Sequence, residues 1–216
     1  MTYPLFITTV LTALTMSANA AVVAFHVSGN NNGALSYPGV LDTTTRNWSQ
    51  IGSQTDTSDS VALDAMTVTA TVDSGTWSYQ NDTVLDVFDR SYYAQGTPMN
   101  VTISGLDNAQ TYNLAVFMRR AFLDRGALAT VNTVGATNPP AEGTTGDDAT
   151  SYIEGTNYVL FEGLSTDGAG NITFAMTNGV DNFTAFNGFE IQNVPEPSSA
   201  ALLGLGGLAL ILRRRQ

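Results

Sequence analysis

Met66-Thr67-Val68-Thr69-Ala70-Thr71-Val72-Asp73 alternates apolar and polar side chains without a break. A period of two residues is typical of a β-strand that turns one face to a hydrophobic core and the other to water. The water-facing positions form a ladder of threonines, whose branched side chains favour extended backbone. This stretch therefore predicts a β-sheet with one buried and one solvated face.

The neighbouring segments follow the same pattern. Residues 99–104 alternate in the same way, and residues 111–118 have mixed faces, which predicts a central strand buried on both sides. Turn residues lie between them, so we expect these two strands to form a hairpin. A second hairpin on the same plan is predicted from residues 157–162 and 171–177. Further candidate strands are 22–27, 84–88, 127–134 and 185–191.

The region between the two chain ends shows no helical period. Short strands separated by Gly, Asn and Asp turns are typical of a sandwich, and roughly eight to ten of them favour a jelly roll. The chain has no cysteine, so no disulfide supports the fold. We predict the all-β class, with one jelly-roll-type β-sandwich domain over residues 21–193.

The N-terminal segment has the pattern of a secretory signal peptide. Residues 5–16 are largely apolar, and Ala18-Asn19-Ala20 follows them. An apolar stretch before an A-x-A site predicts a signal-peptide helix over residues 1–20, cleaved after Ala20, although no Lys or Arg precedes it. The alternative is a first buried segment of the domain.

The C-terminal segment, residues 194–216, has three parts. Pro195 and Pro197 hold an extended segment around Glu196. An uncharged, largely apolar stretch over about residues 198–212 follows, and Arg213-Arg214-Arg215 ends it. Burying three adjacent guanidinium groups in a core is costly, so a short transmembrane helix is favoured over a core helix. The positive charges place the C-terminus in the cytoplasm and the domain outside.

In this order and position, the three parts resemble the PEP-CTERM sorting signal of Gram-negative bacteria. The resemblance implies recognition by an exosortase, a membrane-embedded cysteine transpeptidase, after passage through the secretion machinery. It also implies cleavage near Pro195-Glu196-Pro197 and delivery to the cell surface or the exopolysaccharide matrix, after transient anchoring in the inner membrane. It says nothing about the task of the exported domain.

The domain itself resembles galactose-binding-like jelly-roll domains in three short motifs. These are Ser104-Gly105-Leu106-Asp107 before Thr111-Tyr112, Tyr158-Val159-Leu160-Phe161, and Phe186-Asn187-Gly188-Phe189-Glu190-Ile191. The motifs are structural, so the resemblance implies a fold and transfers no ligand residue.

The chain is strongly acidic. It has 19 Asp and Glu residues against 8 Lys and Arg residues, with a net charge of −11. An acidic surface repels nucleic acid and anionic membrane surfaces, so we exclude both as partners. Neutral sugars, cations and cationic partners remain compatible with it.

Residues suited to catalysis are few. His26 is the only histidine, no Gly-x-Ser-x-Gly motif is present, and without cysteine a zinc site has too few ligands. Paired carboxylates are the remaining route, because glycoside hydrolysis needs only two. Glu154, Glu162 and Glu190 lie in or beside predicted strands, but their spacing does not single them out. We expect no catalytic residue; the alternative is a secreted, carboxylate-based glycoside hydrolase or lyase.

Candidate ligand-binding residues are aromatic side chains with polar neighbours, because sugars stack on flat rings. They are Trp48, Trp77 and Tyr79, for which a place in the core is the competing interpretation. No cofactor is expected. A structural calcium is left open at Asp147 and Asp148, where a loop gathers oxygen ligands, with loop solvation as the alternative. The sequence thus predicts an exported, non-catalytic protein of the bacterial surface or matrix, structural or associated with extracellular polysaccharide.

Overall fold

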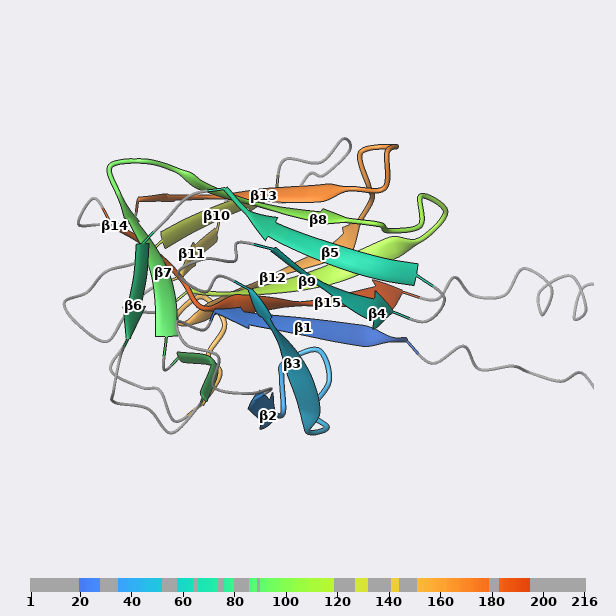
Figure 1. Cartoon of the computed structure of the whole chain (residues 1–216), viewed down its shortest axis with the longest axis horizontal. Helices are drawn as coiled ribbons and strands as arrows, with labels where there is room; N and C mark the ends of the chain where they lie inside the picture. Colours follow the sequence, from blue (N-terminus) through green and yellow to red (C-terminus); the bar gives the residue numbers. More distant parts are fainter. Residues whose placement is uncertain are drawn as a thin grey trace, which may run out of the picture. The chain divides into compact units, whose positions relative to one another are not determined.

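The computed structural model describes residues 20–27, 35–51, 58–63, 66–73, 76–79, 86–88, 90–118, 127–131, 141–143, 151–178 and 183–194 (Figure 1). The predicted signal peptide before Ala20 and the predicted sorting tail after Val194 lie outside these residues. So do Ala18, the proline pair with Glu196, and the three terminal arginines.

Two six-stranded sheets make up most of the described domain. In hydrogen-bonding order, the first sheet contains β12 (Tyr158–Leu164), β9 (Thr111–Phe117), β15 (Gly188–Val194), β1 (Val22–Val27), β3 (Arg46–Ile51) and β2 (Leu35–Tyr37). The second contains β11 (Ala141–Gly143), β10 (Ala127–Val131), β13 (Ile172–Asn178), β8 (Met99–Ser104), β5 (Met66–Val72) and β4 (Ser58–Leu63).

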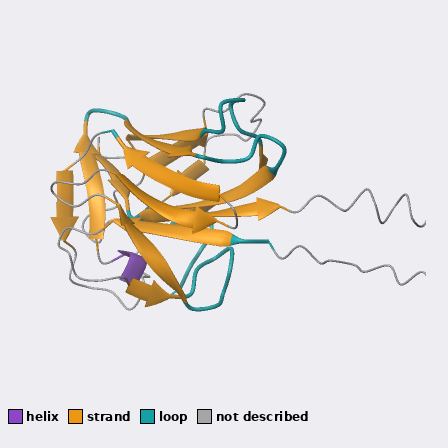
Figure 2. Ribbon diagram, turned by 45° about the vertical axis from the view of Figure 1, so that its right-hand side comes forward, coloured by secondary structure: helices purple, strands orange, loops and turns teal. Residues whose placement is uncertain are grey.

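A third sheet and one short helical turn complete the described part of the chain. The third sheet contains β14 (Phe183–Phe186), β7 (Arg90–Gln95) and β6 (Thr76–Tyr79), and it lies at the left-hand end in Figure 1. The helical turn is the 3₁₀ segment η1 (Asp86–Phe88), shown in purple in Figure 2. The predicted all-β sandwich is therefore confirmed.

The alternation in residues 66–73 positions β5 as expected. Val68, Ala70 and Val72 are buried in the main core, while Thr67 and Thr71 are exposed and Thr69 is half-buried. Side chains of the first sheet, such as Phe25 and Phe189, fill the same core from the other side; their rings stack with centroids 4.9 Å apart. Burial of these apolar faces is the main force that holds the two sheets together.

The two predicted hairpins are wrong, because the paired segments belong to different sheets. β8 and β13 lie in the second sheet, whereas β9 and β12 lie in the first. The connections arch across the core instead of folding back within a sheet. Leu106 N donates to Gly170 O over 3.0 Å and Asn108 Nδ2 to Gly168 O over 2.9 Å, so the two arches stabilise each other. Strands that alternate between two sheets in this way are typical of a jelly roll.

The prediction of two-sided burial for residues 111–118 is confirmed. In β9, Leu114 and Val116 face the main core, whereas Ala115 and Phe117 face a second hydrophobic cluster. That cluster covers the outer face of the first sheet, and its other buried members are Ala24, Tyr37, Trp48, Val87 and Phe88.

The two ends of the described domain lie side by side. β1 and β15 are antiparallel neighbours, with Val22 opposite Gln192. Ala21 N donates to Asn193 Oδ1 over 2.6 Å, and Asn193 N donates to Ala21 O over 3.2 Å. The segments that would carry the signal peptide and the sorting tail thus begin next to each other.

Candidate functional site

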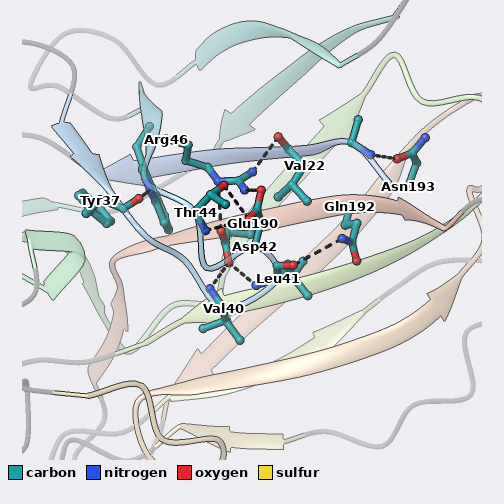
Figure 3. A network of polar contacts seen from close by, with 12 residues as sticks. Val22, Tyr37, Val40, Leu41, Asp42, Thr44, Arg46, Glu190, Gln192 and Asn193 are labelled. Carbon is teal, nitrogen blue, oxygen red and sulfur yellow. Dashed lines mark hydrogen bonds and ion pairs between the residues drawn. The ribbon is translucent and has the colours of Figure 1, made fainter. Parts of the chain in front are cut away.

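One carboxylate of the domain is fully buried. Glu190 lies in β15 with no exposed surface, and its Oε2 accepts hydrogen bonds from Val40 N at 2.6 Å and Leu41 N at 2.9 Å (Figure 3). Burial raises the pKa of Glu190, against the opposing effects of the two amide donors and of the Arg46 charge. The carboxylate thus fastens the segment after β2 to the middle of the first sheet.

Arg46 is the cation of this network. Its Nη1 donates to Val22 O at 2.9 Å, its Nη2 pairs with the Asp42 carboxylate, and its Nε lies 3.9 Å from Glu190 Oε1 (Figure 3). The Arg46 side chain is only 13% exposed. The positive charge therefore lies between two carboxylates, which compensates part of the cost of burying Glu190.

Gly39 makes room for this arrangement. Gly39 is buried, and a Cβ at this position would overlap the Glu190 carboxylate. The close approach lets the amides of Val40 and Leu41 reach Glu190. The network has the features of a structural clamp, because Glu190 Oε2 accepts two amide hydrogen bonds and Arg46 lies between two carboxylates, although Arg46 Nε and Glu190 Oε1, 3.9 Å apart, form no hydrogen bond.

The exposed end of the clamp gives a prediction for the pH dependence of stability. The Asp42 carboxylate accepts hydrogen bonds from Thr44 N at 2.8 Å and Thr44 Oγ1 at 2.7 Å, and these bonds, then the Arg46 charge, lower the pKa of Asp42 below its ordinary value of 3.8. A lowered pKa contributes stability that is present above the ordinary value and is lost as the pH falls through the folded-state pKa.

We therefore expect Asp42→Asn to lower the melting temperature at pH 6, and we expect this effect to disappear as the pH falls below the ordinary pKa of 3.8 and through the lower folded-state pKa. Melting curves of both proteins between pH 2 and pH 7 test this. A difference that stays constant over the whole range would contradict it. Glu190 has the opposite effect on the pH dependence of stability, because its raised pKa means that the folded state binds the proton more readily than the unfolded state. Glu190 is present in both proteins.

The structure places Trp48 in the second hydrophobic cluster. Its side chain is 1% exposed, its ring stacks on Tyr37 with centroids 4.5 Å apart, and its Nε1 donates to Tyr37 O at 3.1 Å. Trp48 therefore presents no ring face to a sugar. Trp77 and Tyr79 lie in β6, opposite Tyr92 and Arg90 of β7, and their side chains are outside the described part of the structure.

The carboxylates predicted as an alternative catalytic set have different environments. Glu190 is buried, whereas Glu154 and Glu162 are exposed. His26 lies in β1, is 1% exposed, and has Nδ1 at 3.3 Å from Val27 O. The Asp147 and Asp148 loop lies outside the described residues. Among the described residues, no group of three or more acidic, histidine or cysteine side chains is arranged to hold a metal.

The solvated face of the second sheet presents hydroxyl groups in register. We call it the hydroxyl face and define it by Ser58, Ser60, Thr69, Thr71, Thr102 and Thr173. Three cross-strand pairs lie within hydrogen-bonding distance, namely Ser58–Thr71 at 3.1 Å, Ser60–Thr69 at 2.7 Å and Thr102–Thr173 at 3.5 Å. The sequence predicted the threonine ladder of β5, but not the strands that extend it.

The Arg46–Glu190 contact was missed from sequence. One signal was available, because Glu190 stands between Phe189 and Ile191 in a predicted strand, where a buried carboxylate requires a partner. The partner is 144 positions away, and no local pattern identifies it.

One comparison with known protein families matches the tail of the chain. A family described as the PEP-CTERM protein-sorting motif matches residues 193–215. The predicted PEP-CTERM signal is therefore confirmed, and it implies an exported protein that is recognised and sorted by an exosortase through a C-terminal membrane-anchor-type signal. No curated protein matches the chain. No described helix is long and apolar enough to cross a membrane.

Two solved structures have a limited similarity to this chain. One is a family two carbohydrate esterase from Cellvibrio japonicus, with 10% identity and a TM-score of 0.26, over 60% of this chain and 36% of that one. The other is the N-terminal endo-1,4-beta-D-xylanase 10B of Clostridium thermocellum, complexed with xylohexaose. It has 12% identity and a TM-score of 0.28, over 82% of this chain and 25% of that one. The chain spans about a third or less of either protein, and TM-scores this low support no functional conclusion.

Proposed function

We propose that this protein is a non-catalytic component of the bacterial cell surface or extracellular matrix, structural or glycan-associated, that an exosortase releases from a transient membrane anchor. The PEP-CTERM motif at residues 193–215 carries this proposal, because such a motif implies an exported protein that an exosortase sorts. The adjacent ends of the domain support it. Ala21, which follows the predicted signal peptide, and Asn193, at the start of the sorting motif, are hydrogen-bonded neighbours.

The surroundings of the buried carboxylate support a non-catalytic role. A glycosidase needs two carboxyl groups that reach the same sugar. Glu190 has no exposed surface, and the amides of Val40 and Leu41 occupy its Oε2. The alternative of a polysaccharide-active enzyme therefore gains no support from Glu190, the buried carboxyl group whose pKa is raised.

Replacing Pro195, Glu196 and Pro197 by alanine tests the sorting step. We expect the unprocessed chain to stay in the membrane fraction, because the apolar segment and the terminal arginines still anchor it while the recognised motif is gone. The native chain should be recovered in shortened form from the surface or the medium. Immunoblots of cytosol, membrane, surface and medium fractions measure this.

The matched control replaces Pro139 and Pro140, a proline pair away from the tail, by alanine. This variant should be processed like the native chain. Equal processing of the Pro195-Glu196-Pro197 variant, or recovery of the native full-length chain from the cytosol, would contradict the proposal.

A further inference from the structure

The hydroxyl face contains a row of four side chains that crosses four strands. Ser58 of β4 is opposite Thr71 of β5, Thr71 is opposite Thr102 of β8, and Thr102 is opposite Thr173 of β13. Neighbouring strands are about 4.8 Å apart, so the row extends over about 14 Å. A second, shorter row contains Ser60 and Thr69, two positions along the same strands.

The hydroxyl pairs keep hydrogen-bonding capacity for a ligand. A Ser or Thr hydroxyl has one donor and two acceptor sites, so a pair joined by one bond retains one donor and three acceptors. Ser58, Ser60 and Thr71 are exposed, and Thr69, Thr102 and Thr173 are half-buried. The face therefore offers both donors and acceptors in a regular array, as a polymer of hydroxylated rings requires.

The six side chains that define the hydroxyl face are uncharged, although the chain has a net charge of −11. Acidic residues of the same sheet lie beside this face. Asp59 of β4 is half-buried and opposite the core-facing Ala70, and Glu142 of β11 is opposite Leu128, two strands beyond the end of the row. At the border of the face, the Asp73 carboxylate accepts hydrogen bonds from Asn100 N at 2.8 Å and Asn100 Nδ2 at 2.6 Å. An uncharged ligand matches this face, whereas an anionic polymer would be repelled by the acidic molecule.

The face also lacks the features of a protein-binding surface. Among the described residues, Ile153 is the one large hydrophobic side chain counted as exposed, at 39%, and it lies outside the second sheet. Interfaces between proteins usually bury an apolar or aromatic centre. The hydroxyl face has no such centre.

We infer that the hydroxyl face binds an uncharged polysaccharide, whose chain lies across the strands along the row from Ser58 to Thr173. The inference rests on the proposed function, because it needs the domain outside the cell, where such polymers occur. It deepens that proposal by assigning a ligand class and a surface. A second copy of this chain and an anionic polysaccharide are the competing occupants.

Affinity electrophoresis of the full chain in mild detergent tests the inference. The gels contain dextran, galactomannan, hydroxyethyl cellulose or, as the anionic comparison, alginate. We expect retardation by at least one of the three neutral polymers and none by alginate. Thr71→Val with Thr102→Val removes two hydroxyls and keeps the branched shape, so the dissociation constant should rise about 25-fold, roughly fivefold for each lost hydrogen bond.

Two control variants separate binding from folding. Thr111→Val, in β9 of the other sheet, should bind like the native chain. Thr71→Ser with Thr102→Ser keeps both hydroxyls and should retain most of the affinity. If the valine pair lowers the melting temperature by more than a few degrees, Ser60→Ala with Ser58→Ala on the edge strand β4 takes its place, with the same expected direction.

Several outcomes would overturn the inference. They are the absence of retardation by every neutral polymer, equal retardation of the native and valine variants, and retardation by alginate alone. Sedimentation that shows a dimer, dissociated by the valine pair, would assign the face to a second copy. If the chain is still sorted correctly in any of these cases, the proposed function remains supported. Failure of the polysaccharide inference can therefore be distinguished from failure of the proposed function.

Discussion

Replacing Glu190 by alanine is expected to lower the free energy of unfolding by about 3–5 kcal/mol, as for other buried ion pairs that lose one partner. The substitution leaves the amides of Val40 and Leu41 without their acceptor, and Arg46 loses one of its two carboxylate partners while it keeps Asp42 and the Val22 carbonyl. Urea unfolding followed by tryptophan fluorescence measures the change, because Trp48 is buried in the neighbouring cluster.

Glu190→Gln is the matched control. Glutamine keeps an oxygen acceptor for the two amides but removes the charge near Arg46, so we expect a smaller loss of about 1–3 kcal/mol. Equal loss in both variants would mean that the charge, and not the hydrogen bonds, holds the clamp. Native-like unfolding of the alanine variant would contradict the clamp altogether.

Gly188→Ala is expected to cost at least about 3 kcal/mol, because it combines overpacking with a backbone conformation that favours glycine. Gly188 begins β15 with a φ of 157°, opposite His26 of β1 and Phe117 of β9. A Cβ there would overlap Phe25 O and lie 3.0 Å from the His26 Cα. β1 has little freedom to retreat, since Val27 N donates to Asn187 O at 2.8 Å.

Gly163→Ala is a comparison in which a positive φ occurs without a close contact. Gly163 has a φ of 65°, but no atom lies within 4 Å of the position that its Cβ would take. The conformational cost alone, about 1–2 kcal/mol, should appear there. Urea unfolding of the two variants under identical conditions measures the difference. Equal effects at both positions would show that the close contact with β1 contributes nothing.

The sequence predicted the strands better than their arrangement. Residues 66–73 and 99–104 show period two, and they form β5 and β8 with the expected core and solvent faces. Periodicity reports only which face of a strand is buried. It does not tell whether the next strand pairs with it or crosses to the other sheet, so both hairpins were assigned incorrectly.

For the candidate sites too, the sequence predicted local features but not the contacts between distant strands. The threonines of β5 were predicted to face water, but the row from Ser58 to Thr173 depends on the register of four strands from distant parts of the chain. Glu190 was chosen only as one acid among many. Its burial depends on Gly39 and Arg46, which approach it in the folded domain and are remote from it in the sequence.

The position of β15 has a consequence for how the protein matures. This strand forms backbone ladders with β9 on one side and β1 on the other, and its last two residues, Asn193 and Val194, already belong to the matched motif of residues 193–215. The first sheet therefore stays split into two parts until β15, the last described strand, is added. During synthesis and secretion, which begin at the N-terminus, the domain can close only after residues 188–194 have emerged. The sandwich is therefore completed at the same time as the sorting tail becomes available. A chain truncated before residue 188 lacks β15, so it should reach the exterior unfolded and be degraded.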